Sequence, residues 1–247
     1  MKLLRNLLRQ AMPLATRQTL AHAMRHWRDR RRGVLLKRAH SGADLHGYTL
    51  QAEVVQPVRP GALFENKLRN LAKGANGIDL STVAPGQVWS FWCYVGEPNE
   101  RNGYVYGRNL VNGQLTRQLG GGLCQLSSML YHLGLLAGML VDERHPHSID
   151  IYREHERFTP LGADATVVWG FKDLRLVNPH PVDIVFRCRL EGHFLKGYVY
   201  AKGKLPKIEL SFAREQLQPD RVLVRTLVNK ARHTETIYVQ RHLDLVA

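Results

Sequence analysis

The chain has 247 residues, of which 44% are hydrophobic and 23% charged, and its formal net charge at pH 7 is +14. This length can bury a sizeable core, and the composition is that of a globular protein rather than a disordered or repetitive one. The charge is concentrated, because residues 1–40 hold eleven Lys and Arg against a single acid, Asp29. Since the remainder is close to neutral and no recognised module accompanies the arginines, we do not expect a nucleic-acid-binding protein.

The cysteines and the apolar runs indicate where the chain resides. Cys93, Cys124 and Cys188 form no CxxC pair, which excludes a zinc ribbon and a disulfide framework and fits a reducing compartment. No apolar run approaches the ~18 residues needed to span a bilayer. Arginines also interrupt the segment where a signal peptide would have its uncharged centre. We therefore expect a cytoplasmic protein that is at most peripheral at the inner face of the membrane.

The basic N-terminal segment, residues 1–32, is expected to form two amphipathic helical pieces. The second piece places Leu20, Met24 and Trp27 on one face and ends in a run of arginines. A basic amphipathic helix can lie on an anionic membrane surface. The alternative is that its apolar face packs on the body of the protein while the arginines are solvated.

Short elements of both kinds follow this segment. They are a strand within 48–55, a helix at about 63–75 ended by Gly74 and Gly77, an aromatic-rich strand at 88–95 and a hairpin turn at Asn112-Gly113. A helix at about 124–139 comes next, with apolar residues at helical spacing. It is apolar enough to be the buried central helix of the fold.

After residue 148 the pattern becomes one of short apolar runs separated by turn residues, which is typical of strands. The expected strands cover 148–152, 165–171, 174–177, 182–190 and 194–201, and residues 207–212 and 223–239 supply two or three more. The class is therefore α+β with a mainly antiparallel sheet. We divide the chain into the basic segment 1–40, an α+β domain at 41–205 and a C-terminal β extension at 206–247 packed on it.

The most informative segment is Gly120-Gly121-Gly122-Leu123-Cys124-Gln125-Leu126-Ser127-Ser128. Its glycines allow a close backbone approach and lead into a helix at Cys124. A cysteine at a helix N-terminus faces unpaired N–H groups and the positive end of the helix dipole, and both favour the thiolate. Cys124 is therefore a candidate nucleophile. The alternative is a buried structural thiol, which is what we expect of Cys93 and Cys188.

A second cluster, Glu143-Arg144-His145-Pro146-His147-Ser148, follows that helix. His145 and His147 would face the same side of an extended segment, so that either could act as the base for Cys124. Asp164 is the candidate for the group that orients the imidazole. The alternatives are a histidine that only hydrogen-bonds a turn and a carboxylate that only starts a strand.

Further residues near the cysteine are candidates for binding substrate or stabilising an oxyanion. They are Gly121, Gly122, Gln125, Ser127 and Arg144. Gln125 could donate its side-chain amide to an oxyanion, as could the backbone N–H groups of Cys124 and Gln125. Ser127 could instead belong only to the first turn of the helix, and Arg144 could form a surface ion pair with Asp142 or Glu143.

No metal and no cofactor is expected. Cys124, His145 and His147 could together supply three zinc ligands, but no fourth ligand or metal-type spacing is evident. The glycine triplet is not followed by the lysine of a phosphate loop, and the chain has no dinucleotide fingerprint.

Several motifs in the central region occur together in order. They are Pro85-Gly86-Gln87-Val88-Trp89-Ser90-Phe91, Val111-Asn112-Gly113, the Gly120–Ser128 segment, Glu143-Arg144-His145-Pro146-His147-Ser148 and Gly162-Ala163-Asp164-Ala165-Thr166-Val167. In these motifs the chain resembles the VanW family over roughly residues 63–190. The resemblance implies a link to glycopeptide resistance and the cell envelope, and it implies no particular reaction. Many members look like surface or secreted proteins, whereas this chain starts with the basic helix.

Two functions from different classes follow from the sequence. The first is a thiol-dependent acyl transferase or amidase, with a cell-envelope or peptide-like substrate and Cys124 as its nucleophile. The alternative is a non-catalytic ligand-binding domain that is peripherally membrane-associated through residues 1–32.

Overall fold

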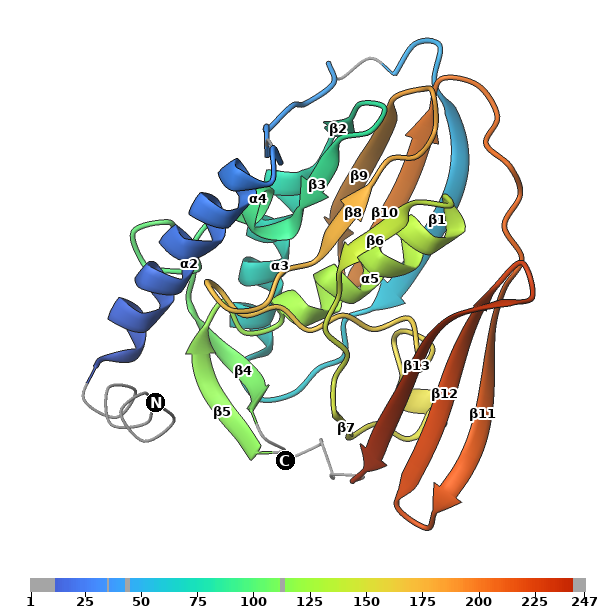
Figure 1. Cartoon of the computed structure of the whole chain (residues 1–247). Coiled ribbons are helices and arrows are strands. Elements are labelled where there is room, and N and C mark those ends of the chain that lie inside the picture. Colours follow the sequence, from blue (N-terminus) through green and yellow to red (C-terminus); the bar gives the residue numbers. More distant parts are fainter. Residues whose placement is uncertain (1–11, 35, 43–44, 112–113, 242–247) are drawn as a thin grey trace.

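The computed structural model describes residues 12–34, 36–42, 45–111 and 114–241. Within them, four α-helices and thirteen strands arranged in mainly antiparallel sheets confirm the expected α+β class (Figure 1). No helix in this described part is both long and apolar enough to cross a lipid bilayer.

Helix α2 (Leu14–Arg31) is the second of the two pieces expected at the N-terminus, and the first lies outside the described residues. Its apolar residues Leu20, Met24 and Trp27 are 48%, 59% and 54% exposed. The alternative in which this face packs on the body is therefore wrong for these three residues. The opposite face is the attached one, because the Asp29 carboxylate accepts two hydrogen bonds from the Arg175 guanidinium at 2.7 and 2.8 Å.

The core is built from two sheets around one helix. The first sheet has the order β1 (Thr49–Pro57), β10 (Phe194–Ala201), β9 (Ile184–Glu191) and β2 (Ser81–Val83). The second has the order β3 (Val88–Ser90), β8 (Arg175–Val177) and β6 (Leu140–Glu143). Helix α5 (Leu123–Leu136) packs against both sheets, since a Cβ on Gly197 of β10 would meet Leu133 at 2.7 Å and one on Gly134 would meet Leu176 of β8 at 2.7 Å. This confirms the buried central helix.

Helix α3 (Phe64–Ile78) is longer than expected, because Gly74 and Gly77 lie inside it instead of ending it. A Cβ on Gly74 would come within 2.8 Å of Leu123, and one on Gly77 within 2.7 Å of the Tyr94 carbonyl oxygen. Both glycines therefore serve close packing, and α3 is held directly against the start of α5.

Two expected strands are wrong. The segment 88–95 is a strand only up to Ser90, whose Oγ accepts a hydrogen bond from the Cys93 N–H and so caps helix α4 (Phe91–Val95). The segment 165–171 joins no sheet and forms only an isolated bridge between Val168 and Lys172. At Ala165, the backbone groups bond to side chains. Ser128 Oγ accepts from the Ala165 N–H at 3.1 Å, and Ser127 Oγ donates to the Ala165 carbonyl at 2.6 Å.

A hairpin of β4 (Tyr106–Val111) and β5 (Gln114–Leu119) stands beside the start of α5. The expected turn at Asn112-Gly113 lies outside the described residues. Helix α5 ends at Leu136, three residues before the expected end at about 139, and the next element is β6, in which Leu140 is 59% exposed.

The C-terminal strands form a separate sheet, seen as the red and orange ribbons of Figure 1. Its order is β11 (Leu210–Gln218), β12 (Arg221–Val228), β13 (Ala231–Gln240) and β7 (Ile149–Asp150), and the β13–β7 pair is parallel. A short 3-10 turn (Glu154–Glu156) follows β7. Through β7 this sheet is joined to the segment that carries the candidate histidines.

Candidate thiol site

The glycine turn before α5 is held by backbone contact and by one amide. Gly121 lies against Gly107 of β4 so closely that a Cβ on Gly121 would be 2.3 Å from the Gly107 carbonyl carbon. Asn70 of α3 donates from Nδ2 to the carbonyls of Gly121 and Val105, both at 3.0 Å, and accepts from the Val105 N–H at 3.0 Å. Gly122 has a φ of +103°, a conformation that favours glycine. Together these contacts fix the position from which Cys124 enters the helix.

Cys124 occupies the second position of α5, half-buried, with its Sγ 3.8 Å from the Val167 carbonyl oxygen. The His147 side chain interacts with the thiol and favours its charged form. In the described part of the chain, the Cys124 N–H donates to no backbone carbonyl, whereas the Gln125 N–H donates to the Gly122 carbonyl at 2.9 Å. Of the two backbone donors expected for an oxyanion, only the one on Cys124 is therefore open.

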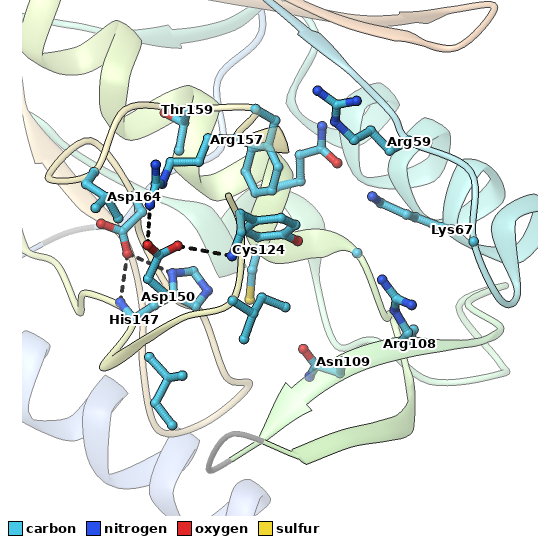
Figure 2. A pocket seen from close by; sticks show the side chains of 18 of the residues that line it. Arg59, Lys67, Arg108, Asn109, Cys124, His147, Asp150, Arg157, Thr159 and Asp164 are labelled. Carbon is cyan, nitrogen blue, oxygen red and sulfur yellow. Dashed lines mark hydrogen bonds and ion pairs between the residues drawn. The ribbon is translucent and has the colours of Figure 1, made fainter. Parts of the chain in front are cut away.

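His147 is fixed on its other side by Asp164. Oδ2 of Asp164 accepts hydrogen bonds from both Nδ1 and the backbone N–H of His147, each at 2.7 Å. The second oxygen, Oδ1, accepts from Arg144 at 2.9 Å and from the Tyr238 hydroxyl of β13. Asp164 therefore holds His147 through Oδ2, as the dashed lines in Figure 2 show, while its Oδ1 is occupied by Arg144 and Tyr238. Because His147 in turn interacts with the thiol, Cys124, His147 and Asp164 form one series.

The electrostatics of the series favour an ion pair. Burial opposes charge on each group, but hydrogen bonds to Asp164 and Cys124 outweigh it for His147 and raise its pKa to about 10. The hydrogen bond and charge of His147 likewise outweigh burial at Cys124 and hold the thiol pKa below its ordinary value. The pKa of Asp164 is also lowered, because His147 and Arg144 overcome its burial. These shifts favour a thiolate and an imidazolium near neutral pH.

His145 is not part of this series. Its Nε2 lies 2.9 Å from Glu143 Oε1, and Glu143 itself bonds to Arg25 of α2. The expectation that the two histidines reach one site from the same side of a strand is wrong, because β6 ends at Glu143 and the segment from 144 to 148 is irregular. Of the two candidates, only His147 contacts the thiol.

The remaining candidates divide between the pocket and its support. Ser127 Oγ donates to backbone carbonyls and does not line the pocket. This agrees with the alternative that Ser127 belongs only to the first turn of the helix. Arg144 forms neither the expected surface ion pair nor a part of the pocket wall, because it is buried against Asp164. Gly122 and Gln125 do line the pocket. Gln125 donates its Nε2 to the Pro57 carbonyl at 3.0 Å, so that amide is engaged where we expected an oxyanion donor.

The thiol, His147 and Asp164 open onto a pocket (Figure 2). Its walls come from α3, β4, the segment after β1 and the segment that follows β7. Four basic side chains line it, namely Arg59, Lys67, Arg108 and Arg157. Asp150 also lines it and is paired with Arg157. The described residues contain no group of three or more His, Cys, Asp or Glu arranged to hold a metal ion.

The other two thiols behave differently from Cys124. Burial raises the pKa of both Cys93 and Cys188. Cys188 is fully buried in β9, and Cys93 is half-buried in α4. Neither contacts a histidine in the described structure, which is the reason for the contrast.

Sequence reasoning missed Asn70, Lys67, Arg108 and Tyr238. Asn70 and Lys67 lie on a helix whose polar positions look like an ordinary solvated face, and Arg108 lies on a charged hairpin. Tyr238 reaches Asp164 from 74 residues further along the chain. A tyrosine between the apolar residues Ile237 and Val239 was the one available signal for it.

Comparisons with known proteins match the central region. A family model described as "VanW like protein" matches residues 66–200. The uncharacterized protein YoaR of Bacillus subtilis is 32% identical over 128 residues, which cover 52% of this chain and 41% of YoaR. The vancomycin B-type resistance protein VanW of Enterococcus faecalis is 29% identical over 154 residues, or 62% of this chain and 56% of that protein. The chain thus spans about half the length of these relatives. No solved structure gives a significant match.

Proposed function

This chain belongs to the VanW family, and on that premise we propose that it is a thiol-dependent acyl transferase or amidase acting on a peptide-like substrate of the cell envelope. The observation that carries the proposal is the series Cys124–His147–Asp164 at the wall of a pocket, in which Asp164 hydrogen-bonds the histidine and the histidine interacts with the thiol. A nucleophile, a base that touches it and a group that orients the base are the parts such a reaction requires.

In the proposed first step, the Cys124 thiolate attacks the carbonyl carbon of an amide, and a C–S bond forms. The carbonyl oxygen becomes an oxyanion, for which the open Cys124 N–H at the start of α5 is the available donor. The His147 imidazolium then gives its proton to the leaving amine as the C–N bond breaks. The product is a thioester on Cys124 and a free amine.

In the second step, water or an amine attacks the thioester carbonyl. His147, now neutral, accepts the proton of the attacking group, and the thiolate leaves as the C–S bond breaks. Water gives hydrolysis and an amine gives acyl transfer. Asp164 keeps Nδ1 of His147 protonated throughout, so that Nε2 is the atom that exchanges the proton.

We infer the substrate class in part from the name of one relative. One of them is named for vancomycin B-type resistance, and vancomycin is a glycopeptide antibiotic. This directs the search for substrates toward peptides of the cell envelope. The pocket supports a peptide-like ligand because it combines polar side chains with the apolar surface of Phe64, Ile151 and Phe158.

The proposal is tested by trapping the thioester. The full chain is incubated with a mixture of peptidoglycan fragments, and its intact mass is followed with Cys124→Ala as the matched control. We expect an added acyl mass that hydroxylamine removes and that Cys124→Ala never acquires. If iodoacetamide modifies Cys124 only after the protein is unfolded, the thiol is a core residue. The enzyme proposal is then wrong and the non-catalytic ligand-binding domain takes its place.

We also propose that α2 docks the protein on an anionic membrane surface. The exposed stripe of Leu20, Met24 and Trp27 lies next to four exposed arginines, and Arg31 stacks over the Trp27 ring at 4.0 Å. Co-sedimentation with phosphatidylglycerol vesicles should exceed that with phosphatidylcholine vesicles, and the double variant Met24→Asp, Trp27→Asp should lose it. Equal sedimentation of the variant and the parent protein would contradict the assignment.

A further inference from the structure

The proposed reaction places negative charge on the carbonyl oxygen under attack, and that oxyanion needs hydrogen-bond donors. Enzymes that pass through such an intermediate generally hold two donors in place before the reaction starts. In this site the open Cys124 N–H is one of them. Gln125, whose amide the sequence predicted as a donor, is already bonded to the Pro57 carbonyl through Nε2. A second donor is therefore expected on another part of the pocket wall.

Among the uncharged side chains that line the pocket, one hydroxyl has no partner in the described structure. Asn109, Thr159 and Tyr238 line the pocket too, and each of them donates to another protein group. The Tyr152 hydroxyl, in contrast, forms no hydrogen bond with any residue that the structure describes. A hydroxyl that is open beside a reactive thiol is available to a ligand, and it can donate to a carbonyl oxygen.

The Tyr152 side chain is held in place before any ligand binds. It lies two residues beyond β7, on the same stretch of pocket wall as His147. Its ring packs edge-to-face on Phe158 with the centroids 5.4 Å apart, and its backbone N–H donates to Asp150 Oδ1 at 3.3 Å. Asp150 is itself paired with Arg157. Such fixed placement is what a donor to a developing oxyanion requires.

The state of the hydroxyl also suits a donor. Burial raises the pKa of Tyr152 to about 12; the positive charge of Arg108 opposes this rise, and the negative charge of Cys124 adds to it. The hydroxyl therefore keeps its proton near neutral pH. It is also close enough to Cys124 to respond to charge there, and attack moves this charge from the sulfur to the carbonyl oxygen.

We propose that Tyr152 is a catalytic residue of the thiol reaction, whose hydroxyl donates the second hydrogen bond to the oxyanion formed when Cys124 attacks a carbonyl. The inference rests on the proposed function, because it concerns an intermediate of the same reaction. It assigns Tyr152 to the oxyanion and leaves activation of the thiol to His147 and Asp164.

The test compares two reagents on the full chain, p-nitrophenyl acetate and iodoacetamide. With the ester, a C–S bond forms at the carbonyl carbon and the oxygen becomes an oxyanion. The C–O bond to the aryl group then breaks and leaves an acetyl thioester and p-nitrophenolate. With iodoacetamide, a C–S bond forms at the methylene carbon and iodide leaves, so that no oxyanion arises. The ratio of the two rates therefore isolates oxyanion stabilisation from thiol reactivity.

Tyr152→Phe keeps the ring and removes the hydroxyl. It should lower the rate of p-nitrophenolate release by about tenfold or more, since the loss of one oxyanion donor costs roughly a hundredfold or more in an enzyme with its own substrate. The rate of alkylation of Cys124 by iodoacetamide and the midpoint of its pH profile should not change. An unchanged alkylation profile also shows that the variant is folded.

Two controls accompany this variant. Tyr106→Phe makes the same change at a 51% exposed position of β4 that does not line the pocket, and it should leave the ratio unchanged. Cys124→Ala measures the release that does not depend on the thiol, and this background is subtracted from every rate.

The outcomes separate the two proposals. If Cys124 reacts with both reagents and Tyr152→Phe leaves the ratio unchanged, the role of Tyr152 is wrong and the thiol enzyme stands. The role is wrong as well if Lys67→Met lowers the ratio and Tyr152→Phe does not, because the donor is then the ammonium group on the same wall. If Cys124 is inert to both reagents in the folded protein, the proposed function is wrong and the role of Tyr152 falls with it.

A fluorinated side chain gives an independent test that keeps both the ring and the hydroxyl. 3,5-Difluorotyrosine at position 152 has a more acidic hydroxyl than tyrosine, and once ionised it can no longer donate. We expect the ratio of acylation to alkylation to fall with rising pH in this protein and to stay level in the parent protein. The same pH dependence of the ratio in both proteins would overturn the assignment.

Discussion

Two charge networks meet at the segment that leaves β6, and they do different things with similar residues. Glu143 and His145 belong to a network with Arg25, Asp29, Asp173 and Arg175, which joins α2 to the body. Arg144 and His147 belong to a network with Asp164 and Tyr238, which ends at the Cys124 thiol. The first network is closed on itself, whereas the second has one end in a pocket. The difference teaches that a histidine beside a carboxylate is a functional signal only where its other side reaches a reactive group.

The largest expected effect separates the two histidines. His147→Ala should slow alkylation of Cys124 at pH 6 by about a thousandfold, because the thiol loses the group that stabilises its thiolate. His145→Ala should change the same rate by no more than about twofold, as it removes only a partner of Glu143. Rates of iodoacetamide modification measured by mass spectrometry decide the matter. Equal effects of the two variants would break the distinction between the networks.

The next effect concerns stability in the closed network. Asp29→Ala should lower the free energy of unfolding by about 3 kcal/mol, because it leaves the buried Arg175 guanidinium without one of its carboxylates. Urea denaturation measures the loss, and Arg28→Ala, an exposed neighbour on α2, is the control. The pH profile of Cys124 alkylation should not move in either variant. A shifted profile in Asp29→Ala would mean that the two networks are coupled.

The open network should make stability depend on pH in a particular window. The pKa of folded His147 is about 10 against an ordinary 6.5, so its stabilising effect is fully present below pH 6.5 and is lost as the pH rises through 10. Up to the ordinary pKa of a cysteine this loss is offset by the lowered pKa of Cys124. We therefore expect the parent protein to lose about 1 kcal/mol relative to the double variant Cys124→Ser, His147→Gln, and to lose it only above about pH 8.5. Denaturation curves at several pH values supply the comparison. A constant difference between the two proteins would contradict the ion pair.

The smallest expected effect tests whether the Tyr238 hydroxyl helps to hold Asp164 in place. Tyr238→Phe removes a hydroxyl that donates to Oδ1 of Asp164 and accepts from the Gly162 N–H at 3.0 Å. The alkylation rate at pH values below the midpoint of its pH profile should fall by about fivefold, because the midpoint moves upward, as expected for the loss of one hydrogen bond to a charged group. A loss of stability with an unmoved midpoint would make Tyr238 a packing residue only.

Much of the fold could be predicted because the relevant signals are local. The apolar spacing of α5 and the alternation of β9, β10, β12 and β13 are properties of short windows, and the structure follows them. The prediction of a strand over residues 88–95 was wrong because the capping residue Ser90 starts a helix there and outweighs the strand preference of the aromatic residues that follow. The prediction that Gly74 and Gly77 end the helix was wrong because a glycine needed for close packing looks the same in sequence as one that ends a helix.

The candidate site shows the same boundary between local and distant information. Glycines before a helix point to Cys124, and the two histidines are visible as a motif, but the choice between them depends on where β6 ends. Lys67 and Arg108 carry no local mark, since only the contact of Gly122 with Lys67 and that of Gly107 with Gly121 bring them to the thiol. The periodicity of a sequence carries no information about such contacts between separate elements.

The parallel pairing of β13 with β7 has a consequence for the order in which the protein matures. Tyr238 is 74 residues beyond the carboxylate it holds, so synthesis delivers Cys124, His147 and Asp164 long before β13 can close on them. A contact of such long range also forms late in folding. Cys124 therefore gains the part of its reactivity that depends on Tyr238 only after β13 has paired with β7.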